Sequence, residues 1–178
     1  MKTQLLILTF FTLLSCSKKD DPELKPIDKL PPLTHTGANT AGCLVNGEAF
    51  LPKGYTPSGN LRCYFINQKD FLLSINEIIS NKFKRISIYY SIPNLIENSI
   101  YKLNEVSTTN DKSAEFVINE ARPQNPNFYT TTPTVTGELI ITHHNYNNAT
   151  ISGTFWFDAV NSNGEKVEVR EGRFDMEY

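Results

Sequence analysis

The chain has 178 residues, of which 39% are hydrophobic and 20% charged, with a formal net charge of −2 and a pI near 5.9. This length suits one domain with a sizeable core. A slightly acidic chain without a clustered basic face gives no electrostatic basis for binding nucleic acid, so we expect no such partner. Eleven Phe and eight Tyr favour strands, because aromatic side chains fit a pleated, half-buried surface.

The N-terminal segment has the layout of a bacterial lipoprotein signal peptide. After a short, weakly positive start, residues 5–14 form an apolar run that is too short to span a bilayer, which needs about 20 residues. The run ends in Leu13-Leu14-Ser15-Cys16, which resembles the lipobox at which the signal is cleaved and the Cys acylated. We therefore predict a signal peptide at residues 1–15 and a lipidated Cys16 that anchors the protein to a membrane. A simple secretory peptide with an incidental Cys is the alternative.

Residues 16–42 are predicted to be a flexible tether. The stretch is charged and proline-rich and lacks periodic apolar positions, so it cannot offset its ordering entropy. Ser17 after the Cys resembles the pattern of lipoproteins that are passed to the outer membrane. The following Lys-Lys-Asp-Asp run resembles the surface-export signal of Bacteroidota-type lipoproteins, although a solvated linker also explains such a run. We expect an outer-membrane protein whose domain is exposed on the cell surface or faces the periplasm.

Residues 43–178 form the predicted domain, and its first half alternates with the period of half-buried strands. Asn46-Gly47 lies between two short apolar runs, which indicates a tight hairpin. Further strands are predicted over residues 61–65, 71–76, 86–92, 101–103 and 114–119. Residues 93–99 are either a loop or one helical turn, and residues 121–133 are a loop with a possible edge strand near Tyr129.

The C-terminal third predicts three strands of an antiparallel meander, over residues 135–142, 151–159 and 167–178. In the last strand, Val167 and Val169 share one parity and Phe174 and Met176 the other. A glycine β-bulge at Glu171-Gly172 would bring all of them, with Tyr178, to one face. About nine or ten strands without crossover helices predict an all-β fold, an antiparallel meander forming a β-sandwich or a partly closed β-barrel.

The cysteines and histidines give no metal or catalytic pattern. Export would take Cys43 and Cys63 to an oxidising compartment, where we expect a disulfide between them, with two buried thiols or a reactive pair as alternatives. His143 and His144 are adjacent and point to opposite faces of a strand, and His35 falls in the tether. The chain has no Gly-x-Ser-x-Gly elbow, and its paired acids lie in the tether. We expect no metal, no cofactor and no enzymatic activity.

Three aromatic residues are candidate binding residues. By alternation Trp156 faces away from the side that carries Phe155 and Phe157. Tyr64 and Tyr89 lie on the polar face of their strands by the same rule. Such rings can stack on sugars or anchor protein partners, although a second packed sheet face would bury the same residues.

These residues favour a non-catalytic binding module for a glycan or an envelope protein. One alternative is a lipocalin-like carrier of a small apolar ligand, which needs a cavity among Phe155, Phe157 and Phe174. The other is an envelope structural protein.

Two segments resemble a family of uncharacterised exported lipoproteins from Bacteroidota-type bacteria. One is the opening at residues 36–47 (TGANTAGCLVNG), with Phe50 to Gly54 after it. The other is the closing pair ISGTF at residues 151–155 and EGRFD at residues 171–175. Ala41 departs from the pattern, in which an aromatic residue is common. The resemblance implies export, lipidation and a β domain, and it supplies no activity.

Overall fold

The computed structural model describes residues 24–80, 82–107, 112–119 and 126–178, which form eleven strands and one 3-10 helix. The predicted signal peptide and Cys16 lie outside the described residues. The elements are η1 (Pro26–Lys29), β1 (Thr40–Val45), β2 (Glu48–Phe50), β3 (Leu61–Ile66), β4 (Asp70–Ile79), β5 (Lys82–Ser91), β6 (Ile100–Leu103), β7 (Lys112–Asn119), β8 (Asn127–Thr130), β9 (Gly137–Asn145), β10 (Thr150–Val160) and β11 (Lys166–Glu177). Among these described residues no helix is long and apolar enough to cross a membrane.

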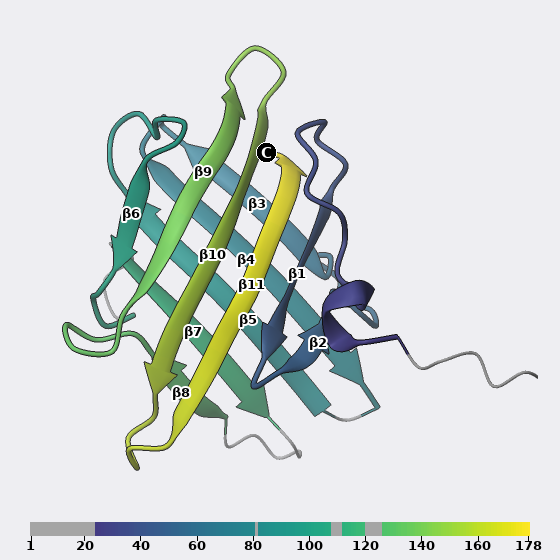
Figure 1. Cartoon of the computed structure of the whole chain (residues 1–178), viewed down its shortest axis with the longest axis vertical. Coiled ribbons are helices and arrows are strands. Elements are labelled where there is room, and N and C mark those ends of the chain that lie inside the picture. The colour runs from purple at the N-terminus through teal and green to yellow at the C-terminus, as the bar shows by residue number, and fades with distance from the viewer. Residues whose placement is uncertain (1–23, 81, 108–111, 120–125) are drawn as a thin grey trace, which may run out of the picture.

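All the strands belong to one antiparallel sheet that folds over into two layers. The order is β2-β1-β11-β10-β8-β7-β5-β4-β3, while β9 also pairs with β10 and carries β6 on its other side. Figure 1 shows β6, β9, β10, β11 and β1 as one layer, with β7, β5, β4 and β3 crossing behind it. The end strands β2 and β3 do not pair with each other, so the sheet is not closed. The predicted all-β fold, a sandwich or partly closed barrel, is confirmed.

The predicted hairpin after β1 is confirmed by its backbone. Asn46 and Gly47 have φ angles of 50° and 87°, the positive values that a two-residue turn between twisted strands requires. The Asn46 side chain also accepts a hydrogen bond of 2.8 Å from the backbone N–H of Glu168. The turn is therefore tied to β11 as well as to its own hairpin.

The predicted bulge in β11 is also present. Phe155 lies opposite Gly172 and Phe157 opposite Val169, so the register shifts between them, and Glu171 has a φ of 55°. A Cβ on Gly172 would lie 2.4 Å from the Phe155 ring, which explains why glycine stands there. The bulge brings both halves of β11 onto the core, where Val169 and Phe174 are buried.

The space between the layers is packed with side chains. Phe155, Phe157 and Phe174 are 3%, 0% and 3% exposed. Rings from the two layers meet there, as Phe71 and Phe174 do with centroids 5.8 Å apart. The cavity that a lipocalin-like carrier would need at these three residues is filled.

The prediction of a flexible tether as far as residue 42 needs correction. Leu30 is buried, Ala41 is 2% exposed, and β1 begins at Thr40. The Thr36 hydroxyl and the Gly37 N–H both donate to the buried carboxylate of Asp175. This segment is held by hydrogen bonds to a residue near the other end of the chain. Such hydrogen bonds produce no periodic pattern of apolar residues, so the sequence did not reveal them. The packed domain therefore begins before residue 43.

The disulfide predicted between Cys43 and Cys63 is not formed, because both are free thiols buried in the core. They lie on β1 and β3, which are not neighbours in the sheet. Burial raises the pKa of the Cys63 thiol to about 12 and raises the pKa of Cys43 as well. The two cysteines match the alternative of two buried thiols, and the raised pKa keeps both protonated.

Candidate functional site

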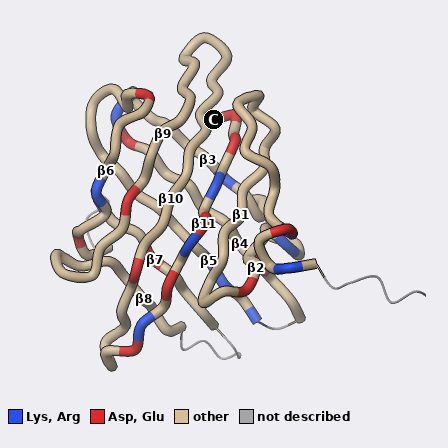
Figure 2. The backbone as a smooth tube through the Cα atoms, viewed as in Figure 1, with Lys and Arg blue, Asp and Glu red and all other residues tan. Residues whose placement is uncertain are grey.

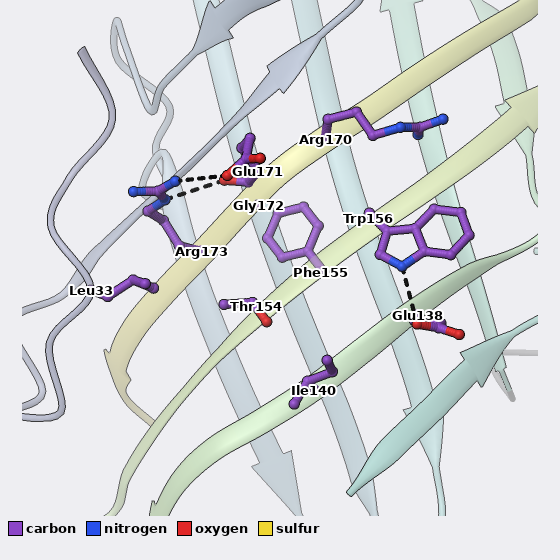
Figure 3. Close-up of a pocket in the computed structure, with 10 residues that line it drawn as sticks. All are labelled: Leu33, Glu138, Ile140, Thr154, Phe155, Trp156, Arg170, Glu171, Gly172 and Arg173. Carbon is purple, nitrogen blue, oxygen red and sulfur yellow. Dashed lines mark hydrogen bonds and ion pairs between the residues drawn. The ribbon is translucent and has the colours of Figure 1, made fainter. Parts of the chain in front are cut away.

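A groove of about 370 Å³ crosses the outer face of β9, β10 and β11. Each strand contributes side chains of outward parity, and the segment before β1 adds one wall. Figure 3 shows its lining: Leu33, Glu138, Ile140, Thr154, Phe155, Trp156, Arg170, Glu171, Gly172 and Arg173. The groove lies outside the packed interior, on the surface of the layer that contains the C-terminal strands.

The hollow follows from the bulge in β11. Gly172 and its partner Phe155 both face the core, where a Cβ on Gly172 would meet the Phe155 ring, so neither residue places a side chain on the outer face. Figure 3 shows Trp156 on one side of this floor and Arg173 on the other. The backbone irregularity thus creates a depression on a sheet face that side chains would otherwise cover.

Trp156 is fixed in position by polar neighbours. Its indole Nε1–H donates to Oε2 of Glu138 at 3.2 Å, and the guanidinium carbon of Arg170 lies 5.4 Å from the centroid of the indole. Arg170 in turn donates to Oδ1 of Asp158 at 2.6 Å. The indole is half-buried, and no further layer of described residues covers it. A ligand would meet a ring whose orientation is already set.

The charges around the groove cancel. Two guanidiniums, of Arg170 and Arg173, stand against two carboxylates, of Glu138 and Glu171. Arg173 pairs with Glu171 at 3.3 Å. Figure 2 shows the same mixture of signs along β11. A neutral groove with fixed donors and acceptors suits an uncharged, hydroxyl-rich ligand better than a phosphate, which would require unpaired positive charge.

The other two candidate binding residues lie elsewhere. Tyr64 on β3 and Tyr89 on β5 both pair with Leu72 of β4, so the three form one row on the outer face of the second layer. Tyr64 is 42% exposed and Tyr89 is half-buried. Because β3 and β5 belong to the layer behind β10, these tyrosines and Trp156 do not share a surface (Figure 1).

Sequence reasoning missed the polar residues of the groove. Glu138, Arg170 and Arg173 take the outward parity of strands beside Trp156, which is a signal that the alternation contained. Their convergence depends on the register of β9 against β10 and of β10 against β11, and alternation alone does not specify which residues lie opposite each other.

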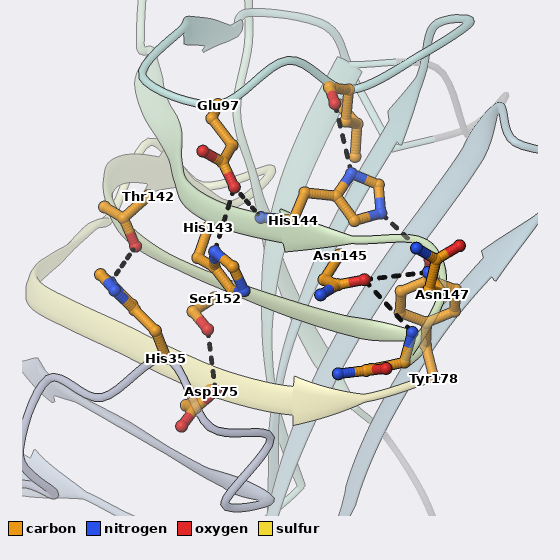
Figure 4. A network of polar contacts seen from close by, with 12 residues as sticks. His35, Glu97, Thr142, His143, His144, Asn145, Asn147, Ser152, Asp175 and Tyr178 are labelled. Carbon is orange, nitrogen blue, oxygen red and sulfur yellow. Dashed lines mark hydrogen bonds and ion pairs between the residues drawn. The ribbon is translucent and has the colours of Figure 1, made fainter.

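The histidines meet at one end of the sheet (Figure 4). His35 stacks on His143 with centroids 5.5 Å apart, and Nδ1 of His143 lies 3.1 Å from Oε1 of Glu97. His144 points the other way, and its ring contacts Phe65 at a centroid distance of 5.0 Å. In the described parts of the chain, no group of three or more His, Cys, Asp or Glu residues could hold a metal ion.

A family model described as "Domain of unknown function (DUF6252)" matches residues 80–176, which is more than half of the chain. The match includes β9, β10 and the groove residues of β11. No curated protein matches the chain. No solved structure matches it either.

Proposed function

The chain belongs to the DUF6252 family, a domain of unknown function, and we propose that it is an exported, lipid-anchored binding protein that holds a hydroxyl-rich ligand beside Trp156. One observation carries the proposal: the outer groove sets an indole next to fixed carboxylate and guanidinium groups. Sugars present apolar C–H faces together with hydroxyls, and both kinds of group find partners on such a wall. The ligand class is therefore an envelope or environmental glycan of low charge.

Export and anchoring rest on the N-terminal sequence. Leu13-Leu14-Ser15-Cys16 resembles a lipobox, and the opening and closing segments resemble uncharacterised Bacteroidota-type lipoproteins. Acylation at Cys16 would fix the protein to the outer membrane, with the domain on the cell surface or in the periplasm. In the folded domain these two segments meet, since Thr36 of the first bonds Asp175 of the second.

Binding without catalysis fits the groove better than an enzyme does. The side chains that could act as acid or base are engaged with neighbours: Glu138 with the indole, and Glu171 with Arg173. Thr154 is the hydroxyl among the lining residues, and none of those residues is a histidine that could activate it. The packed Phe155, Phe157 and Phe174 argue against the carrier alternative in the same way.

The proposal is tested by capture of polysaccharides from an envelope extract on the immobilised, full mature protein. We expect specific retention of neutral glycans, lost on Trp156→Ala because the wall of the groove is removed. Tyr64→Ala is the matched control, an aromatic truncation on the other layer, and it should retain the glycans. Equal retention by both variants would contradict binding at the groove. No retention by the unaltered protein would leave an envelope structural role as the better account.

A further inference from the structure

One edge of strand β3 has no partner among the described residues. There β3 ends the sheet and pairs only with β4. No backbone hydrogen bond joins residues 61–65 to any other segment that the structure describes. A strand edge of this kind presents N–H and C=O groups that can pair with another strand.

The ladder with β4 identifies the groups on that edge. The N–H of Asn76 donates to the carbonyl of Asn60 at 2.7 Å, so Asn60 faces β4. In an antiparallel ladder alternate residues face the same way, and Arg62, Tyr64 and Ile66 therefore also direct their backbone groups to β4. The remaining residues, Leu61, Cys63 and Phe65, direct theirs to the free edge.

This edge lacks the features that usually prevent pairing. At the other end of the sheet, β2 has three residues and lies against η1 (Figure 1). In contrast, β3 has six residues, no proline and no register shift against β4, and Arg62 is its one charged residue. The outward side chains of Tyr64 and Ile66 are 42% and 55% exposed beside it. Natural sheets use prolines, bulges or charges to prevent pairing at their edge strands, and β3 has only the charge of Arg62.

We propose that this edge binds β3 of a second copy of the chain in antiparallel, two-fold pairing, with Cys63 opposite Cys63 of the second copy. Leu61 then faces Phe65 of the other copy, and each hydrogen-bonded residue pair contributes two backbone hydrogen bonds. Other registers leave some of these edge groups unpaired.

The side chains of the outer face favour a second copy over an unrelated strand. In this register Arg62 lies opposite Tyr64 of the other copy, and the two-fold axis repeats the contact. Arg62 is half-buried beside the exposed Tyr64, and a guanidinium over a phenol ring is attractive. The two arginines do not face each other, so the pairing brings no like charges together.

Disulfide cross-linking of the intact, membrane-anchored protein tests the register. Both cysteine variants also carry Cys63→Ala, because in the proposed register the free thiol of Cys63 lies opposite its own copy and would cross-link by itself. Cysteines introduced together by Arg62→Cys and Tyr64→Cys would then face each other across the interface, and mild oxidation should give a dimer on a non-reducing gel. The matched control combines Arg62→Cys with Ile66→Cys, which faces the same side two residues out of register, and should give little dimer. Equal dimer from both pairs, cross-links mainly to a different envelope protein, or no dimer from a folded first variant would each overturn the proposal.

A charge swap tests the same contact without cysteines. Tyr64→Arg sets two guanidiniums opposite each other, and we expect the dimer dissociation constant of the detergent-solubilised protein to rise by at least about tenfold. Adding Arg62→Glu to that variant should restore dimerisation, because each facing pair then has opposite charges. A monomeric unaltered protein, or a double variant no better than the single one, contradicts the pairing.

Discussion

At the scale of single residues, the carboxylate of Asp175 joins the N-terminal segment to β11. Asp175 is 1% exposed and accepts hydrogen bonds from Thr34 Oγ1 at 2.6 Å, Gly37 N–H at 2.8 Å and Ser152 Oγ at 2.8 Å, among others. Burial opposes its charge, but these hydrogen bonds together hold its pKa well below the usual range of an aspartate. The ionised form is the one that keeps residues 34–38 in place.

Replacing this carboxylate should loosen the segment. We expect Asp175→Asn to lower the free energy of unfolding by about 3 kcal/mol, because several donors lose a charged acceptor. Thermolysin should also cleave within residues 30–38. Asp70→Asn is the control, since Asp70 is exposed and accepts one hydroxyl bond, from Ser91, and it should cost less than about 1 kcal/mol. Equal costs for the two variants would show that the Asp175 contacts do not hold the segment.

Protonation of His144 should make the stability of the protein depend on pH. Its Nδ1 lies 3.2 Å from the Leu95 carbonyl and its Nε2 lies 3.1 Å from the Tyr178 hydroxyl, so a neutral ring donates to the first and accepts from the second. Burial lowers its pKa. The unfolded chain therefore takes up a proton below about pH 6.5 that the folded chain does not, and stability falls as the pH drops through that range.

The change His144→Phe should reduce this dependence. The variant keeps a ring against Phe65 but cannot take up a proton, so its melting temperature should fall less between pH 7.5 and pH 5.5 than that of the unaltered protein. At pH 7.5 it should be the less stable of the two, because the Leu95 carbonyl and Tyr178 hydroxyl lose a partner. Parallel pH curves for the two proteins would rule out His144 as the source.

At the scale of elements, the bulge in β11 both completes the core and forms the groove. Gly172→Ala should destabilise the protein by about 1–3 kcal/mol, because the added methyl overlaps the Phe155 ring. Gly47→Ala is the control: Gly47 has a positive φ of 87°, which Gly172 does not, but nothing lies within 4 Å of its Cβ, so the change should cost about 1 kcal/mol. Denaturant unfolding measures both, and a smaller loss at Gly172 than at Gly47 would contradict the packing described.

Local signals predicted the elements well and their assembly less well. Period-two alternation and turn residues located the hairpin at Asn46-Gly47 and the bulge at Glu171-Gly172, because both are decided by neighbours in sequence. Three other features depend on strand order. The segment before β1 packs on Asp175, Cys43 is separated from Cys63, and Trp156 and Tyr64 lie on different layers. Alternation assigns a side chain to one face of its own strand and does not specify which layer that strand joins.

At the scale of the whole molecule, the proposed anchor makes a separate prediction. Cys16→Ala should abolish labelling with radioactive palmitate and move the protein from the membrane to the soluble fraction, because the acylated residue is lost. A variant that still incorporates palmitate would contradict lipidation at this residue.

Binding of a glycan on the outer groove can be observed directly, because the chain carries one tryptophan. The indole Nε1–H of Trp156 gives a single resonance in a nitrogen-correlated NMR spectrum of the labelled protein. Addition of the neutral glycan fraction should shift this resonance in a saturable manner, together with the backbone signals of Glu138, Thr154 and Arg173. Saturable shifts confined to Tyr64, Tyr89 or the interior around Phe157, with the indole signal unmoved, would contradict the account.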